Sequence, residues 1–224
     1  MNMLDMERIL KRLSIRRPIF HSEADFQHEL AWEIHLGDPS LNVRLEQPFP
    51  GRSRGAIDLV VSKEFCSHAI ELKYLTRQFI AIHNGEEFKL KQHSAQDLRR
   101  YDICRDIERM EEFAHGPCRT ASVIALTNDP YYWQGRQNSG TIAEAFDVSE
   151  GRTVNGDLQW ASHTGAGTMK SRETPISIIG SHLIGWTDYS DLGKNGHFRY
   201  TYTFLSSPES SRNAGLPVNV LCKR

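Results

Sequence analysis

Two neighbouring apolar segments, residues 56–62 and 68–74, carry charged side chains that apolar strands rarely contain. Their composition and the short polar connection between them predict two strands of a hairpin. The first segment contains Asp58, and the second contains Glu71 and Lys73. Because side chains alternate along a strand, Glu71 and Lys73 share one face of the second strand. Charges are almost never fully buried unless they are paired or hold a metal, so these strands restrict both the fold and its chemistry.

Two carboxylates and an amine at one edge of a sheet suit a hard divalent cation, which prefers carboxylate oxygens together with water and phosphate. We expect Asp58 and Glu71 to hold Mg²⁺, for which Mn²⁺ can substitute, with the backbone carbonyl of Leu72 as a further ligand. Lys73 would orient the attacking water or stabilise developing negative charge. The alternative is an internal salt-bridge network among these charges, which burial without a ligand would make costly.

A helix is predicted from Glu23 to about His35, between the N-cap Ser22 and the helix-stopping Gly37. At 100° per residue, Glu23 lies at the head of the stripe that faces inward. Glu23 would ligate a second ion or hold a metal-bound water. An acidic residue in the first turn also suits the helix dipole, and the position of Glu23 fits that interpretation equally well.

The inward Glu23, then Asp58, then Glu71-Leu72-Lys73 on the next strand resemble the PD-(D/E)XK nuclease superfamily. This family includes restriction endonucleases, Holliday-junction resolvases and many defence or mobile-element nucleases. The resemblance covers roughly residues 20–127. It implies a restriction-endonuclease-like α/β (α+β) fold, in which a central mixed β-sheet is flanked by helices. It also implies metal-dependent cleavage of nucleic acid, usually DNA.

The chain departs from the family pattern at two places. Ile57 stands where the family name has Pro. Some relatives carry a Gln and a Tyr separated by three residues on the following helix, whereas Gln96 and Tyr101 have four residues between them. Gln96 is therefore a candidate site residue that a packed helix face would explain equally well. That helix is predicted over residues 88–114, with apolar side chains on two sides that suit packing between layers.

The composition changes after Tyr131, where glycines are frequent and apolar clusters are few. We expect one domain over residues 1–224, with the nuclease core at about 20–127. A region of short strands and loops at about 131–200 would be an insertion or recognition region, since binding residues are often placed on loops of a rigid scaffold. The predicted C-terminal portion is therefore rich in strands and loops.

Two segments offer candidate contacts to nucleic acid. Arg52 and Arg54 lie in a turn-rich loop and would bind phosphate, although a solvated basic turn explains them at least as well. Trp133 and Arg136 belong to a stretch that mixes aromatic and hydrogen-bonding side chains, which suits base contacts. The same aromatic side chains could equally cap the core.

Bulk properties limit the class of protein. The formal net charge is −1, so binding of nucleic acid would depend on a local basic groove and not on the total charge. The four cysteines (Cys66, Cys104, Cys118 and Cys222) are far apart, which favours buried, reduced thiols over disulfides or zinc ligands. The charged N-terminal segment does not resemble a signal peptide, and no run approaches the ~18 apolar residues of a membrane span. We expect a cytoplasmic protein with no membrane partner.

These features predict a Mg²⁺-dependent DNA endonuclease, restriction-like or of the defence or mobile-element kind. RNA stays open as an alternative substrate, because the metal site acts on the phosphodiester of either polymer. A second hypothesis is a nuclease-fold module whose chemistry has lapsed and that binds nucleic acid or a protein partner without cutting. By analogy we expect a homodimer, since two sites related by a two-fold axis most simply cut both strands of a duplex.

Overall fold

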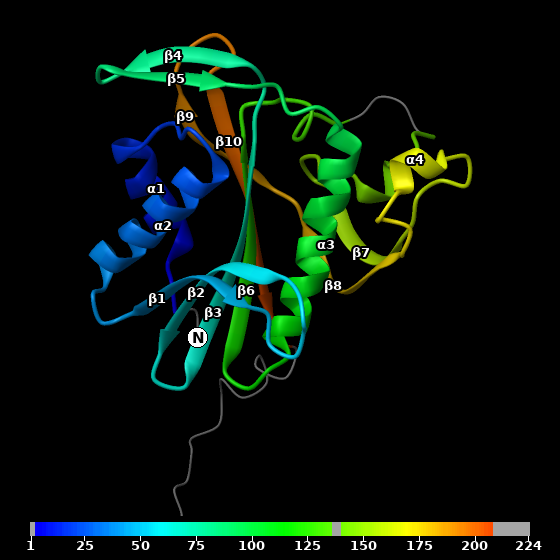
Figure 1. Ribbon diagram of the computed structural model, residues 1–224, viewed down its shortest axis with the longest axis horizontal. Coiled ribbons are helices and arrows are strands. Elements are labelled where there is room, and N and C mark those ends of the chain that lie inside the picture. Colours follow the sequence, from blue (N-terminus) through cyan, green and yellow to red (C-terminus); the bar gives the residue numbers. More distant parts are fainter. Residues whose placement is uncertain (1–2, 136–139, 208–224) are drawn as a thin grey trace, which may run out of the picture.

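A mixed six-stranded β-sheet forms the centre of the protein, in a computed structural model that describes residues 3–135 and 140–207 (Figure 1). The strands lie in the order β1 (Asn42–Pro48), β2 (Ala56–Lys63), β3 (Cys66–Leu75), β6 (Arg119–Thr127), β10 (His197–Ser206) and β9 (Trp186–Asp191). β3 and β6 are parallel, and the other neighbouring pairs are antiparallel. The predicted strands at residues 56–62 and 68–74 and the predicted mixed sheet are confirmed.

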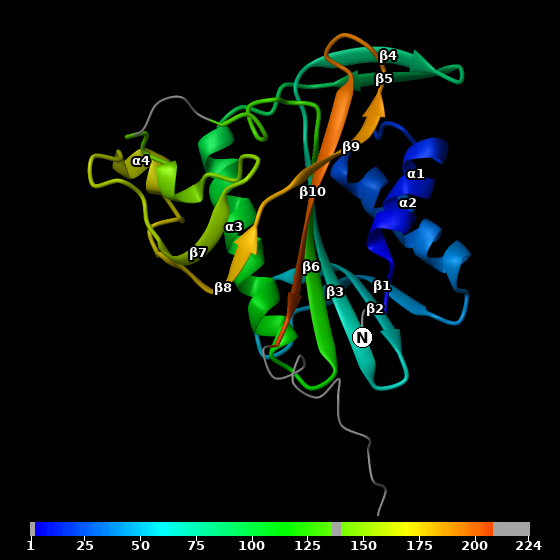
Figure 2. The same ribbon diagram turned by 180° about the vertical axis from the view of Figure 1, so that it is seen from behind.

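Helices cover both faces of the sheet (Figures 1 and 2). α1 (Met6–Arg16) and α2 (Glu23–Gly37) pack on one face, and α3 (Gln96–Ala114) packs on the other. Ser22 caps α2, because its Oγ accepts a hydrogen bond of 3.1 Å from the backbone N–H of Asp25. The predicted helix that begins at Glu23 is confirmed.

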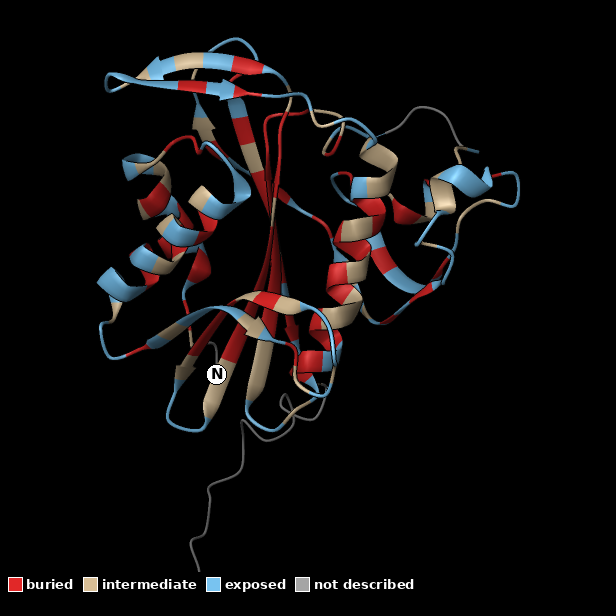
Figure 3. Cartoon of the chain, viewed as in Figure 1, coloured by how far each residue is buried: buried red, intermediate tan, exposed pale blue. Residues whose placement is uncertain are grey.

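The two faces of the sheet are built from different side chains. On the α1–α2 face, Phe20 and Phe26 pack against Tyr74 of β3 within a cluster of large apolar residues. On the α3 face, the residues beneath the helix include Ala69 and Ala121, which let α3 approach the strands closely. Buried residues therefore follow the strands through the centre of the molecule and the inner sides of the helices (Figure 3).

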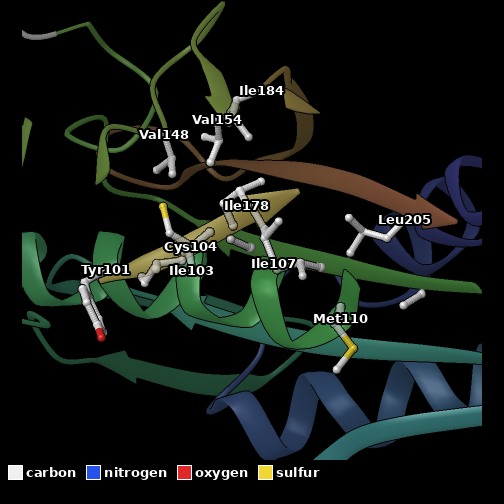
Figure 4. Close-up of a cluster of buried hydrophobic side chains, with 14 of the residues drawn as sticks. Tyr101, Ile103, Cys104, Ile107, Met110, Val148, Val154, Ile178, Ile184 and Leu205 are labelled. Atoms are coloured by element: carbon white, nitrogen blue, oxygen red, sulfur yellow. The ribbon is translucent and has the colours of Figure 1, made fainter. Parts of the chain in front are cut away.

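α3 lies between the sheet and the C-terminal part of the chain (Figure 4). That part contains η1 (Glu144–Phe146), β7 (Thr153–Leu158), α4 (Ala166–Met169) and β8 (Ile176–Leu183), and β7 pairs with β8 as a small antiparallel sheet. Ile103 and Ile107 of α3 share a buried cluster with Val154 and Ile178 of this small sheet. The prediction of a helix packed between two layers is confirmed.

The prediction of a helix over residues 88–114 is wrong at its start. α3 begins at Gln96, and the residues before it form a hairpin of β4 (Phe79–His83) and β5 (Glu86–Leu90). Asn84 and Gly85 join these strands with φ angles of 52° and 82°, the positive values that a tight two-residue hairpin turn needs. The apolar residues of β5 alternate with exposed ones, which is the period of a strand and not of a helix.

The prediction that the cysteines are reduced thiols is wrong for two of them. Cys66 and Cys118 form a disulfide, with their Cα atoms 4.8 Å apart. Because β3 and β6 are adjacent and parallel, two residues 52 positions apart in the sequence meet at the same end of the sheet. Cys104 is free and buried as predicted, whereas Cys222 lies outside the described residues.

Two observations bear on where the protein resides. Among the helices of the described residues, none combines the length and the apolar character that crossing a membrane requires. Disulfides persist mainly in oxidising compartments, so the Cys66–Cys118 bond does not favour the cytoplasm. The cytoplasmic location stays a prediction.

Candidate functional site

β3 separates from β2 partway along its length, and two carboxylates bond to the N–H groups beyond that point. Pairing between the two strands ends at Ile70 of β3. Beyond it, the backbone N–H of Leu72 donates to Asp58 Oδ2 at 2.6 Å, and that of Tyr74 donates to Glu23 Oε2 at 2.8 Å. The fold thus brings Asp58 of β2 and Glu23 of α2 to the same edge of β3.

The side chains of Glu71 and Lys73 are both paired with residues of α3. Glu71 Oε1 lies 3.1 Å from Arg109 Nη2, and Lys73 Nζ lies 2.6 Å from Asp106 Oδ2. Arg109 Nη1 lies 3.3 Å from Asp106 Oδ1, so the four side chains form a continuous chain of ion pairs. Lys73 Nζ also donates to the carbonyl oxygen of Leu72 at 3.1 Å, which means that the ammonium contacts the carbonyl predicted as a metal ligand.

Six charged side chains therefore gather around this part of β3, and we name them the β3 charge cluster: Glu23, Asp58, Glu71, Lys73, Asp106 and Arg109. Four of them are carboxyl groups and two are cations. If all six are ionised, the cluster carries two more negative than positive charges. A divalent cation would balance that excess.

Burial perturbs the titration of the cluster. Glu71 is 3% exposed, and burial raises the pKa of its carboxyl, with a further rise from the carboxylates of Asp106 and Asp58. Burial also raises the pKa of Asp58 and that of Glu23. Glu23 as a whole is exposed to solvent, but its carboxyl group is desolvated. Burial alone would lower the pKa of Lys73, but the surrounding carboxylates raise it above its ordinary value. The ammonium of Lys73 therefore stays charged.

The carboxylates do not form a three-membered ligand set. Within residues 3–135 and 140–207, no three His, Cys, Asp or Glu side chains lie close enough together to form a metal-ligand group. The predicted roles of Glu23, as a ligand of a second ion or a holder of a metal-bound water, stay predictions. Mg²⁺ commonly binds one or two carboxylates and keeps several waters, so oxygen donors from Asp58 and Glu71 still fit it. Glu71 Oε1 is also buried and, in the described part of the chain, accepts no hydrogen bond.

A cleft of about 680 Å³ opens beside the cluster, and residues from the start of α2, the end of β3, β5 and α3 line it. Figure 1 shows how these elements are placed. Its basic lining residues outnumber its acidic ones. The basic side chains are Lys73, Lys89, Lys91, Arg99, Arg105 and Arg109, and the acidic ones are Glu23, Asp102 and Asp106. The near-neutral chain therefore has a locally basic cleft, as nucleic-acid binding would require.

Among the candidate residues outside the two strands, Glu23 lines this cleft, whereas Gln96, Arg52 and Arg54 do not. Gln96 Nε2 donates to Asp129 Oδ2 at 3.4 Å, at the start of α3. Arg52 pairs with Glu112 and lies over the ring of Phe49. Arg54 is exposed in the loop before β2.

The aromatic segment of the predicted recognition region also lies apart from the cluster. Trp133 packs against Trp186 with the ring centroids 6.0 Å apart, and the guanidinium of Arg199 lies over it at 5.7 Å. This favours the alternative in which the aromatic side chain caps the core. Arg136 lies outside the described residues.

Sequence reasoning missed three residues that position the cluster. Asp106 and Arg109 were not singled out, although they stand three residues apart on the helix that follows the strands, and one helical turn brings such residues together. Gln27 Nε2 donates to the carbonyl oxygen of Asp58 at 2.7 Å and to Glu46 Oε1 at 2.8 Å. Gln27 lies on the inward stripe of α2, and a buried polar side chain on that stripe was the available signal.

Comparison of the chain with protein-family models gives no match, and comparisons with curated proteins and with solved structures give none either.

Proposed function

We propose that this protein is a Mg²⁺-dependent nuclease of the PD-(D/E)XK type, with a restriction-endonuclease-like fold, that hydrolyses phosphodiester bonds of DNA. The observation that carries this proposal is the position of Asp58, Glu71 and Lys73. These residues lie together where β2 and β3 separate, in a cluster whose carboxyl groups outnumber its cations, beside a basic cleft. A purely structural salt-bridge network would have no need of that excess.

The charged residues of this site would have distinct roles in catalysis. Asp58 and Glu71 would hold the cation, since they offer the oxygen ligands that Mg²⁺ prefers. Bound Mg²⁺ would stabilise charge on the scissile phosphate and activate a water. Lys73 remains an ammonium, so it donates hydrogen bonds to the attacking water or to the phosphate and does not abstract a proton. Glu23, fixed by the N–H of Tyr74, is placed to hold a water at the edge of the site.

The cleft supplies the surface for a polyanion. Arg99 and Arg105 of α3 line it from one side, and Lys89 of β5 and Lys91, which directly follows β5, line it from another. Neutralisation of phosphates by such side chains provides most of the sequence-independent affinity for nucleic acid. The basic lining suits DNA and RNA alike, and we propose DNA because most enzymes of this type act on it. A homodimer and a cytoplasmic location belong to the same proposal.

Cleavage of a supercoiled plasmid with Mg²⁺ tests the proposal. Asp58→Asn and Lys73→Ala should each lower the rate by about 100-fold or more, because each removes a group that contacts the reacting centre. Asp102→Asn is the matched control: Asp102 lines the same cleft but pairs with Arg99 and Arg172, outside the cluster. If both Asp58→Asn and Lys73→Ala still cleave the plasmid at the wild-type rate, the proposed nuclease site is wrong.

Two observations favour a second candidate, a module that binds nucleic acid without cutting it. Glu71 and Lys73 are both engaged in ion pairs with α3, and no three-carboxylate group forms in the described residues. Tight DNA binding by the wild-type protein without cleavage, in either Mg²⁺ or Mn²⁺, would support this module. Light scattering with and without DNA would separately test the homodimer.

A further inference from the structure

Arg109 is the cation nearest to the buried carboxylate of Glu71. Its Nη2 lies 3.1 Å from Glu71 Oε1 and donates to the carbonyl oxygen of Ala56 at 2.9 Å. Its Nη1 donates to Asp106 Oδ1 at 3.3 Å. The guanidinium is thus held between β2, β3 and α3, at the centre of the β3 charge cluster.

Glu71 depends on this guanidinium for charge balance. The side chain of Glu71 is 4% exposed, so water cannot solvate its carboxylate well. Lys73, the other cation of the cluster, lies 2.6 Å from Asp106 and donates to the carbonyl of Leu72. Arg109 therefore supplies the positive charge at Glu71.

The contact between Arg109 and Glu71 is close but incomplete. Although Arg109 Nη2 lies 3.1 Å from Glu71 Oε1, that oxygen accepts no aligned hydrogen bond in the described part of the chain. A charge contact without hydrogen-bond alignment is weaker than the bidentate pairing that arginine and carboxylate can form. The hydrogen bonds that Arg109 donates to Ala56 and Asp106 would keep the guanidinium in the cleft even if another cation bound Glu71.

We propose that Arg109 occupies the place of the divalent cation at Glu71 in the metal-free protein, and that cation and guanidinium compete for this carboxylate. The inference rests on the proposed function, because it takes Glu71 as a cation ligand. Arg109 acts through Glu71 and is therefore a positioning residue. Its contact stabilises the carboxylate of Glu71 in the metal-free protein, and the same contact lowers the affinity of the site for the cation.

Titration calorimetry with Mn²⁺ alone, without nucleic acid, tests the competition. Arg109→Met keeps an aliphatic side chain over Phe49 and removes the guanidinium. It should tighten Mn²⁺ binding by about tenfold, a typical size for coupling between two ligands of one site. It should also lower the thermal midpoint of the metal-free protein, because Glu71 loses its partner. A merely structural role would weaken stability and cation binding together.

Arg105→Met is the matched control. Arg105 stands four residues earlier on α3, lines the same cleft and pairs with Glu108, so its removal deletes the same charge without freeing Glu71. This variant should change the Mn²⁺ affinity by less than about twofold, the small effect expected of a screened charge at a distance. Equal tightening in both variants would overturn the inference, because it would reflect the general field of the cleft.

Glu71→Gln separates failure of the inference from failure of the proposed function. If wild-type protein binds Mn²⁺ no better than Glu71→Gln, then Glu71 is not a ligand and the proposed function fails with it. If Glu71→Gln abolishes binding but Arg109→Met does not tighten it, the competition alone is wrong. The native chain offers a further measurement: the Nε–H resonance of Arg109 should shift when Mg²⁺ is added, and that of Arg105 should not. Should Arg109→Met fail to fold, an unshifted Arg109 resonance under saturating Mg²⁺ would still overturn the competition.

Discussion

The two faces of the central sheet are stabilised in different ways, and β3 contributes to both. On the α1–α2 face it places Ile70, Leu72 and Tyr74 in a large apolar cluster. On the α3 face the alternate residues include Glu71 and Lys73, which contact Asp106 and Arg109. The first face needs only that apolar area be removed from water, whereas the second needs each charge to meet an opposite one.

This difference shows how each face responds to substitution and which of them can accommodate a ligand. Apolar packing depends on volume, and substitutions that keep the volume are usually tolerated. The charged face depends on specific pairs, so the loss of one partner leaves the other buried and unbalanced. Function is more readily built on the second face, because a charge that is balanced by a neighbour can also be balanced by a ligand.

Phe26→Ala should have the largest effect on the apolar face. Phe26 is 0% exposed and packs against Phe20 and Tyr74. Truncation should lower the free energy of unfolding by about 4 kcal/mol, as measured by urea denaturation. The Mn²⁺ affinity of the folded variant should stay close to that of the wild type, because the substitution does not touch the β3 charge cluster. A loss of affinity without loss of stability would show that the faces are not independent.

Lys73→Met should remove an ion pair from the charged face and destabilise the fold. Asp106 then loses the partner that lies 2.6 Å away, and the free energy of unfolding should fall by about 3 kcal/mol. The double variant Lys73→Met with Asp106→Leu should lose only about 1 kcal/mol, since replacing both members of a buried pair by apolar groups is often nearly neutral. Additive losses in the double variant would mean that the pair is not coupled.

His68 should make the apolar side of β3 sensitive to acid. Its ring nitrogens contact the hydroxyls of Thr120 and Ser122, and burial lowers its pKa to about 4. The neutral ring is therefore preferred in the folded state, and its contribution is fully present above pH 6.5 and lost as the pH falls towards 4. At pH 5 the loss should be about 2 kcal/mol.

His68→Gln is the control for this pH dependence. Denaturation of both proteins from pH 7 to pH 4 should show a smaller decline for the variant. The difference between the two curves is the relevant quantity, because the raised pKa of Glu71 acts in the opposite direction and favours the folded state as the pH falls. Parallel curves would contradict the assignment to His68.

Ser22→Ala should have the smallest effect. Ser22 caps α2, a helix of the apolar face whose first residue, Glu23, reaches the edge of β3. Loss of the cap should cost about 1 kcal/mol in thermal or urea denaturation. Ser22→Asp retains a capping oxygen and should restore most of that stability. If alanine and aspartate behave alike, the Ser22 side chain does not stabilise the helix.

The sequence predicted the strands that carry the cluster, because Asp58, Glu71 and Lys73 interrupt short apolar segments of clear period. It did not predict their partners. Asp106 and Arg109 stand on a long helix in which several charged residues have the same local pattern, and nothing local shows which of them meet β3. The contact depends on how α3 is placed over the sheet.

The β4–β5 hairpin and the Cys66–Cys118 disulfide were not predicted, for different physical reasons. The β4–β5 hairpin had a local signal, since Asn84-Gly85 is the commonest type of two-residue turn, but the helical interpretation of the segment that follows was preferred. The Cys66–Cys118 disulfide had no local signal in the sequence. Its two sulfurs meet only because β3 and β6 are neighbours in the sheet, and sequence spacing does not reveal which strands are adjacent.

The disulfide also decides what would survive a cut in the chain. It closes a covalent ring over residues 66–118, which contains the exposed hairpin turn at Asn84 and Gly85. A protease that cleaves this turn would leave both pieces joined through Cys66 and Cys118. The nicked protein would migrate as one chain without reductant and as two fragments with it. All six residues of the β3 charge cluster would stay in one covalent molecule.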